Sequence, residues 1–307
     1  MRPLDAELPV ALAPGDGALL ADAIRAGGGR RVSPAEAEAL VWNDWQDVDG
    51  LRACLTDAPQ IRWVQLPFAG VDNFLSVLDG ERIWTSAKGA YSQPVAEHAL
   101  ALGLAGLRQL TVRARARSWG RPAGKRLFRG RVTILGGGGI TEALVPLLAP
   151  FEVEVTVVRR HPTPMSGVAR VVGQDELHDV LPGAALIVLA LALTPQTAGI
   201  IDAAALERID ADAWLVNVAR GAHVVTDDLV MALRTGAIGG AALDVTEPEP
   251  LPDGHPLWDL DNCLITPHVA NTWEMAEPAL AERVRQNVER YRRGEPLLGV
   301  VNPDLGY

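Results

Sequence analysis

The sequence predicts an α/β protein with a doubly wound parallel sheet and a second, smaller α/β domain. From about residue 131, short β-rich runs alternate with helix-like segments, the pattern of a parallel sheet covered by helices on both faces. The β-rich runs are apolar almost throughout, because parallel strands bury both of their faces. The chain has 307 residues, and at roughly 150 residues per domain this length predicts about two domains.

The first ninety residues predict the smaller domain, with strands around Val10, Val41, 61–66 and 83–84. From Pro94, the segment PVAEHALALGLAGLRQL has apolar residues at helical spacing and almost no polar face, so we expect a helix buried between two domains.

The larger domain follows. A helix is expected from Thr226, with a hydroxyl at the N-cap and Gly236 as a stop. An amphipathic helix at 275–293 would return the chain to the first domain. The expected strands are residues 132–135, 153–158, 185–190, 214–218, 240–245 and 263–266.

Composition and charge exclude several classes of protein. Apolar residues make up 48% of the chain and charged residues 21%, as in a compact soluble protein. The formal net charge of −10 disfavours nucleic acid and anionic membranes as partners. The longest apolar stretch, 184–193, is about half as long as a membrane-spanning helix, and no secretory signal is visible, so we expect a cytoplasmic protein. Cys54 and Cys263 have neither disulfide nor metal-ligand spacing, and we expect no metal.

A glycine-rich turn lies between an expected strand and an expected helix. Gly136 and Gly138 occupy the first two positions of the GxGxxG dinucleotide fingerprint. Gly139 and Ile140 begin the helix whose N-terminus would stabilise a pyrophosphate. Thr141 replaces the third glycine, which implies a wider helix-to-strand approach or an altered turn. Glycine runs also occur in ordinary loops, but this position favours a nucleotide site.

The next strand ends in Arg159, Arg160 and His161. An acidic residue at this place accepts hydrogen bonds from the adenosine ribose hydroxyls of NAD. Arginine instead suits the 2′-phosphate of NADP, so the sequence predicts a preference for NADP over NAD. The alternative is that the two arginines only solvate the strand end.

Three polar segments each follow an expected strand: VNVARGAHV with Arg220, ALDVTEPEPLP with Glu249, and LITPHVANT with His268. Residues just past the carboxyl ends of parallel strands converge on one crevice, so we expect these three side chains to meet. A guanidinium fits a planar carboxylate, and an imidazolium can donate a proton to a carbonyl oxygen. Alternatively, Arg220 is only a helix-flanking cation and Glu249 a solvated loop residue.

At these segments the chain resembles the D-isomer-specific 2-hydroxyacid dehydrogenases. The resemblance also rests on FAGVDNF, PVAEHALAL, the glycine turn and the closing Gly306-Tyr307, and it runs over nearly the full length. It implies a Rossmann-type dinucleotide-binding domain at 93–273. It also implies a smaller flavodoxin-like substrate domain at 1–92 plus 274–307, and a homodimer paired through the cofactor domain.

The resemblance also implies the role of each site residue. Arg220 would bind the substrate carboxylate and polarise the 2-oxo group, His268 would be the general acid, and Glu249 would orient His268. Further contacts are implied for the substrate at the N–H groups of Ala69, Gly70 and Val71, and for the cofactor at Thr194 and Asp244.

Other residues carry weaker signals. Ala192 replaces a proline usual in the family, but like Thr141 it removes no catalytic group. Three aromatic residues lie next to segments expected to form the cleft: Trp45, Phe68 and Trp273. Four histidines without evident partners are interpreted as structural: His98, His178, His223 and His255.

These observations predict an oxidoreductase that transfers a hydride between a nicotinamide cofactor and a small 2-oxo or 2-hydroxy acid. Glyoxylate and hydroxypyruvate are the favoured substrates. One alternative is a phosphoglycerate dehydrogenase, which would need a cationic pocket for the phosphate. The other is a non-enzymatic NAD(P)-sensing scaffold of the same fold.

Overall fold

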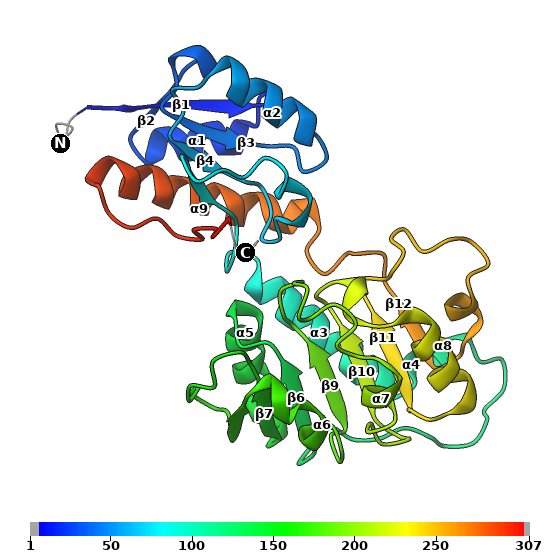
Figure 1. Ribbon diagram of the computed structural model, residues 1–307. Coiled ribbons are helices and arrows are strands. Elements are labelled where there is room, and N and C mark those ends of the chain that lie inside the picture. Colours follow the sequence, from blue (N-terminus) through cyan, green and yellow to red (C-terminus); the bar gives the residue numbers. More distant parts are fainter. Residues whose placement is uncertain (1–5, 304–307) are drawn as a thin grey trace. The chain divides into compact units, whose positions relative to one another are not determined.

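The computed structural model describes residues 6–303 and divides into two compact units. Unit 1 combines residues 6–91 with 272–303, and unit 2 runs from Ser92 to Asn271. The Gly306-Tyr307 pair of the sequence resemblance lies outside the described residues. Each unit contains one parallel sheet with helices on both faces (Figure 1).

The sheet of unit 1 has five parallel strands in the order β2-β1-β3-β4-β5. This is the 2-1-3-4-5 order of flavodoxin-like folds. Helices α1 (Ala18–Ala26) and α9 (Trp273–Arg293) cover one face, and α2 (Val48–Asp57) covers the other. The strands are β1 (Leu8–Ala13), β2 (Gly29–Arg31), β3 (Ala39–Trp42), β4 (Trp63–Gln65) and β5 (Ile83–Thr85).

The sheet of unit 2 has seven parallel strands in the order β12-β11-β10-β9-β6-β7-β8. The chain reverses direction across the sheet between β6 and β9, which is the switch point where doubly wound folds bind ligands. The expected Rossmann-type fold is therefore confirmed. The strands are β6 (Arg131–Leu135), β7 (Glu154–Val158), β8 (Arg170–Val172), β9 (Leu186–Leu189), β10 (Trp214–Asn217), β11 (Gly240–Leu243) and β12 (Cys263–Ile265).

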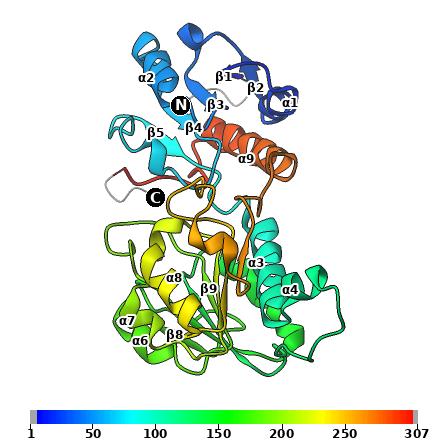
Figure 2. The same cartoon turned by 90° about the vertical axis from the view of Figure 1, so that its right-hand side faces the viewer.

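Helices cover both faces of this sheet (Figure 2). Along β9, Leu186 and Val188 contact one helical layer while Ile187 and Leu189 contact the other, so the strand is apolar at every position. One layer contains α3 (Ser92–Leu107) and α5 (Gly139–Leu148), and the other contains α6 (Leu177–Val180), α7 (Ala203–Leu206) and α8 (Thr226–Thr235).

Helix α3 packs closely on the sheet of unit 2. A Cβ atom at Gly106 would lie 2.1 Å from the ring of Trp214 on β10, and one at Gly103 would lie 2.8 Å from Leu186 on β9. Both positions therefore require glycine unless the packing shifts. This close approach fixes the N-terminal turns of α3, including His98, relative to the strands.

Two expectations about elements need correction. The sequence does not predict the three-residue strands β2 and β8, because each is short and pairs on one side only. Strand β2 carries two exposed arginines, and β8 has only two valines after the exposed Arg170. The expected N-cap of α8 is also wrong. Thr226 is the first helical residue, and its hydroxyl donates to the carbonyl of Glu247 at 2.7 Å, while Val225 is the N-cap.

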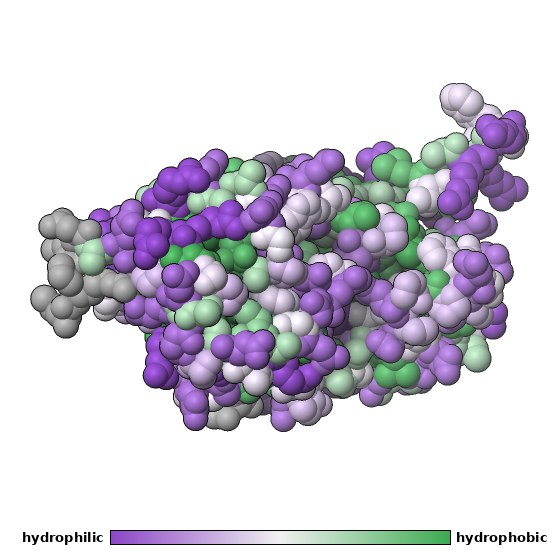
Figure 3. Space-filling view, turned by 90° about the horizontal axis from the view of Figure 1, so that it is seen from above, coloured by the Kyte–Doolittle hydropathy of each residue, from purple (hydrophilic) through white to green (hydrophobic). Residues whose placement is uncertain are grey.

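No helix among residues 6–303 is both long and apolar enough to cross a bilayer. The face shown in Figure 3 carries hydrophilic residues throughout, with hydrophobic residues in small patches between them.

Candidate functional site

The carboxyl ends of the strands of unit 2 lie at one edge of its sheet. Asn217 at the end of β10 pairs in register with Leu189 of β9 and Leu243 of β11, and Leu243 pairs with Ile265 of β12. The loops that follow these strands therefore begin side by side. They carry Thr194, Arg220, Glu249 and His268.

The glycine turn after β6 forms a cradle of the right kind for a pyrophosphate. Gly136 has a φ of +109°, and a Cβ there would lie 2.1 Å from the carbonyl oxygen of Ala190 at the end of β9. A Cβ at Gly138 would meet no atom within 4 Å, so the space beside it is open. Helix α5 begins at Gly139, and the N–H groups of Gly139 and Ile140 have no partner within the helix. These residues fit the phosphates of a dinucleotide.

Thr141 is accommodated inside this turn. Its side chain is buried, and its hydroxyl donates to the carbonyl oxygen of Gly136 at 2.7 Å. The polar group of the threonine is therefore satisfied, and it links the helix to the first glycine of the turn.

Arg159 lies beside the same turn. A Cβ at Gly137 would lie 2.9 Å from both Cδ and Nε of the Arg159 side chain, so the arginine passes directly over this glycine. The N–H of Arg159 is fixed by the carbonyl of Val172 at 3.0 Å. Arg160 and His161, the next two residues, are exposed.

The loop after β9 contains Thr194 and is ordered by Thr197. The Thr197 hydroxyl donates to the carbonyl of Ala192 at 2.8 Å and accepts from the N–H of Thr194 at 2.8 Å. The ring of the buried His223 contacts the carbonyls of Thr197 and Leu191, at 2.9 Å and 3.2 Å. The loop thus keeps a defined shape without the proline that Ala192 replaces.

Arg220 is positioned by Asn217, a buried residue for which the sequence alone predicts no role. The Asn217 amide donates to the carbonyl of Arg220 at 2.8 Å and accepts from the N–H of Ala219 at 3.0 Å. The Arg220 guanidinium donates to the carbonyl of Ala219 at 2.8 Å. The signal for Asn217 is its place in the NVARG motif, three residues before the arginine.

His268 and Glu249 form a hydrogen-bonded pair. Nδ1 of His268 lies 2.6 Å from Oε1 of Glu249. The His268 side chain is 53% exposed and the Glu249 side chain is 41% exposed. Solvent therefore reaches both groups. His268 has a φ of +53°, a left-handed conformation that non-glycine residues rarely adopt. Such a conformation persists only where surrounding contacts impose it.

The charges of this pair stabilise each other. The hydrogen bond and the charge of Glu249 raise the pKa of His268 above its ordinary value, against the opposing effects of burial and of Arg220. The hydrogen bond from His268 holds the pKa of Glu249 below its ordinary value, although partial burial opposes this. The imidazolium–carboxylate form is therefore favoured near neutral pH.

The structure also brings His98 into this group, although the sequence alone indicates no partner for it. Its Nε2 lies 3.0 Å from Oγ1 of Thr266 and 3.3 Å from Oδ1 of Asp244. The expectation that His98 lacks matching side chains is therefore wrong, because α3 brings His98 against the residues that directly follow β11 and β12. His98 lies in the PVAEHALAL motif and Thr266 in the TPHVANT motif, but sequence alone does not show that these two residues meet.

The remaining predicted substrate residues belong to unit 1. Ala69, Gly70 and Val71 follow β4 and precede a short 3₁₀ turn at Asp72–Phe74. Phe68, just before them, contacts the rings of Trp45 and Trp273, at centroid distances of 6.2 and 6.4 Å. We call these three side chains the aromatic cluster. Trp45 is 53% exposed and Trp273 is 42% exposed.

Comparison with known proteins identifies the family. Residues 98–270 match the family model described as D-isomer specific 2-hydroxyacid dehydrogenase, NAD binding domain. A glyoxylate/hydroxypyruvate reductase A from Yersinia enterocolitica is 35% identical over 176 residues, which cover 57% of this chain and 56% of the reductase. The aligned part is thus just over half the length of that relative.

Solved structures extend the similarity to nearly the whole chain. A D-isomer specific 2-hydroxyacid dehydrogenase from Xanthobacter autotrophicus, in complex with NADPH and MES, has a TM-score of 0.86 and 29% identity, covering 98% of this chain and 100% of that one. An NADPH-dependent glyoxylate/hydroxypyruvate reductase from Sinorhizobium meliloti, in complex with NADP and sulfate, has a TM-score of 0.83 and 26% identity, with coverage of 98% and 100%.

The glycine turn, the ordered strand-end loops and the family match over more than half of the sequence all indicate the same family. The chain therefore belongs to the D-isomer specific 2-hydroxyacid dehydrogenase family, and it is an NAD(P)-dependent dehydrogenase with a Rossmann-type cofactor domain.

Proposed function

We propose that the protein reduces small 2-oxo acids with NADPH, and that glyoxylate and hydroxypyruvate are its substrates. The observation that carries this proposal is the His268–Glu249 pair beside Arg220, at the strand ends that also hold the glycine turn. Similarity to two glyoxylate/hydroxypyruvate reductases supports the choice of substrate.

The chemistry assigns one task to each residue. When bound, the nicotinamide supplies a hydride to the 2-oxo carbon, and negative charge then develops on the oxygen. His268 donates its proton to that oxygen, and Glu249, bound to Nδ1, keeps the ring oriented and protonated. Arg220 binds the substrate carboxylate through its planar guanidinium and polarises the 2-oxo group.

We assign unit 1 as the substrate domain and unit 2 as the cofactor domain. In unit 1, the N–H groups of Ala69, Gly70 and Val71 would hold the substrate carboxylate. In unit 2, the pyrophosphate would rest on the turn from Gly136 to Ile140, with Thr194 against the cofactor. The Asp244 carboxylate is 1% exposed and hydrogen-bonded to Thr266, Val269 and Ala270, so we assign it to holding the turn of residues 266–270.

The alternatives are less well supported. A phosphoglycerate dehydrogenase needs cations around the substrate phosphate, but the aromatic cluster is bordered in sequence by Asp44 and Glu274. A purely NAD(P)-sensing scaffold has no need of a protonated histidine held by a carboxylate.

Activity on a panel of 2-oxo acids tests the proposal. We expect NADPH oxidation with glyoxylate and hydroxypyruvate, and His268→Ala should lower kcat roughly 10²- to 10⁴-fold because the proton donor is lost. The Kd for NADPH, measured by fluorescence titration, should not change. A protein that binds NADPH but oxidises it with no 2-oxo acid would favour the scaffold.

Glu249→Gln should lower the pKa of His268, because the hydrogen bond and charge that raise it are weakened. Reduction requires protonated His268, so kcat/KM falls as the pH rises through this pKa. In the variant that fall should occur at lower pH. An NMR titration of the imidazole and the pH profile of kcat/KM measure both effects. Glu247→Gln removes an exposed charge from the same loop and serves as the matched control; an equal shift in that variant would contradict the assigned role.

Arg159→Ala should lower kcat/KM for NADPH about 10- to 100-fold and leave kcat/KM for NADH nearly unchanged, because only NADPH carries the 2′-phosphate. Steady-state kinetics with both cofactors measures the ratio. Arg170→Ala is the control, since Arg170 lies at the opposite end of the neighbouring strand β8 and pairs with Glu176. A wild-type preference for NADH would show that the proposed cofactor selectivity is wrong.

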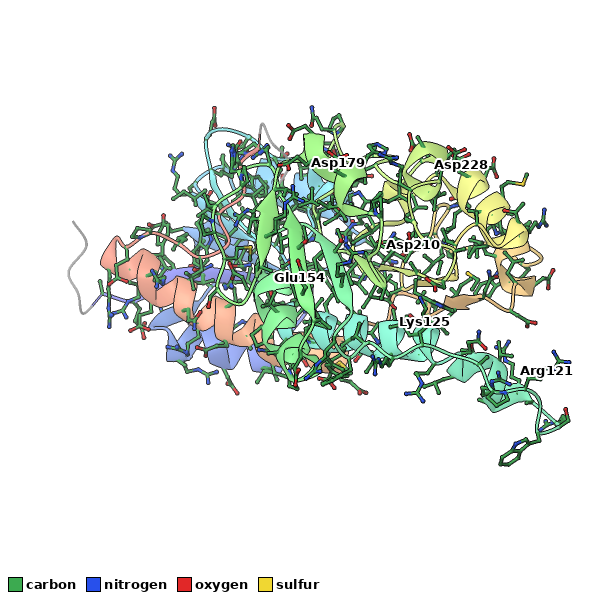
Figure 4. The ribbon with its side chains drawn as sticks, turned by 90° about the horizontal axis from the view of Figure 1, so that it is seen from below. Arg121, Lys125, Glu154, Asp179, Asp210 and Asp228 are labelled. Atoms are coloured by element: carbon green, nitrogen blue, oxygen red, sulfur yellow. The ribbon has the colours of Figure 1, made fainter. Side chains whose placement is uncertain are left out.

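A basic segment of unit 2 supports the homodimer that we also propose. This basic segment directly follows α4 (Leu110–Arg115) and includes Arg117, Trp119 and Arg121. Arg121 lies far from the sheet (Figure 4), and Trp119 is 99% exposed. The chain has no Asp or Glu between Glu97 and Glu142, although its net charge is −10. A second copy therefore offers this segment acidic residues, among them four that Figure 4 labels on separate elements of unit 2: Glu154, Asp179, Asp210 and Asp228.

Sedimentation velocity tests this pairing. The wild type should sediment as a dimer, and the combined substitution of Arg117, Trp119 and Arg121 by alanine should give a monomer with an unchanged circular dichroism spectrum. Trp258→Ala removes another exposed tryptophan of unit 2 and should remain dimeric. A monomeric wild type, or a triple variant that stays dimeric, would rule out this role.

A further inference from the structure

A buried carboxylate lies directly behind the turn that carries His268. The Asp244 side chain is 1% exposed, and its oxygens accept hydrogen bonds from the N–H groups of Val269 at 2.9 Å and Ala270 at 3.0 Å. The main-chain carbonyl of Asp244 accepts from the N–H of His268 at 2.8 Å. A single residue at the end of β11 therefore binds three consecutive N–H groups.

These bonds oppose the relaxation of a strained residue. With a φ of +53°, His268 occupies a region that costs a non-glycine residue free energy. Without the bonds at Asp244, the turn could return to a commoner conformation and move the ring away from Glu249.

Two side chains support Asp244 from the other side. Oγ1 of Thr266 donates to Oδ1 of Asp244 at 2.6 Å, so towards His98 this oxygen can only accept. An ionised carboxylate can also only accept. The Nε2 of His98, which lies 3.0 Å from Thr266 Oγ1 and 3.3 Å from Asp244 Oδ1, must therefore carry a hydrogen and donate it.

The hydrogen bonds also keep Asp244 ionised. Burial raises the pKa of this carboxyl, but the hydrogen bonds from His98, Thr266 and the two N–H groups lower it by more. An ionised Asp244 binds N–H groups more strongly than a neutral one.

We propose that His98 is a positioning residue for the proton donor, acting through Asp244 and Thr266 on the turn of residues 266–270. The role rests on the proposed function, since it assumes that His268 donates the proton. His98 itself touches neither His268 nor Glu249 in any hydrogen bond found among residues 6–303. It transmits the position of α3 to the turn.

The test compares three variants of the full chain. His98→Leu removes the hydrogen-bond donor, and His98→Gln keeps an N–H near the same place. His178→Leu is the control, since it replaces an exposed histidine of α6 by leucine in the same way. We expect His98→Leu to lower kcat about 10- to 100-fold without a change in the Kd for NADPH. His98→Gln should recover most of the loss, and His178→Leu should behave as the wild type.

Hydrogen exchange gives a readout that does not depend on turnover. In His98→Leu the peptide covering 266–270 should exchange faster than in the wild type, while peptides from β6 and β9 should not change. Unchanged exchange with unchanged kcat would overturn the role of His98. If His98→Leu does not fold, Thr266→Val breaks the same link and should give the same two effects. A wild type that reduces no 2-oxo acid would overturn the proposed function, while the exchange result would still decide whether His98 holds the turn.

Discussion

The site depends on the parallel register of β10, β11 and β12. Because Asn217, Leu243 and Ile265 are paired across the sheet, three loops that are distant in sequence start at the same edge. One of them orders Arg220 through Asn217, and the other two carry Glu249 and His268 to within a hydrogen bond. The same edge, beyond β9, carries the glycine turn after β6. The parallel sheet thus determines where each of these loops begins. The hydrogen bonds within each loop then determine how its polar side chain is oriented.

Within this frame, two carboxylates hold one histidine from different sides. Glu249 is partly exposed, binds the ring and sets its charge. Asp244 is buried and binds the backbone of the turn. Solvent can reach the first pair, so in the proposed reaction the proton on His268 would be replaced from water after each transfer. It cannot reach the second, so the hydrogen bonds that hold the turn do not compete with water. A single carboxylate could not combine an exposed and a buried environment.

Sequence patterns predicted most strands of both sheets, the glycine turn and the placing of Arg220, Glu249 and His268 at the strand ends, because apolar strands and the segments after them have strong local signals. They did not predict β2 and β8, whose edge positions need no apolar run. Nor did they predict the roles of Asn217 and His98. Asn217 acts through main-chain bonds in its own turn, and His98 acts across 168 positions of sequence separation from Thr266. Such a contact depends on how closely α3 approaches the sheet, which Gly103 and Gly106 permit.

Positive groups gather in particular places of this negatively charged chain. A protein with a net charge of −10 repels dinucleotides and 2-oxo acids at long range, so attraction must come from local positive groups. Under the proposed function, Arg159 beside the glycine turn, Arg220 and His268, whose pKa is raised, would provide it at the strand ends. The basic segment around Arg121 is separate from this edge. If both cationic regions served the cofactor, the second would be redundant, whereas in the proposed homodimer a second acidic copy of the chain would use it without competing for the site.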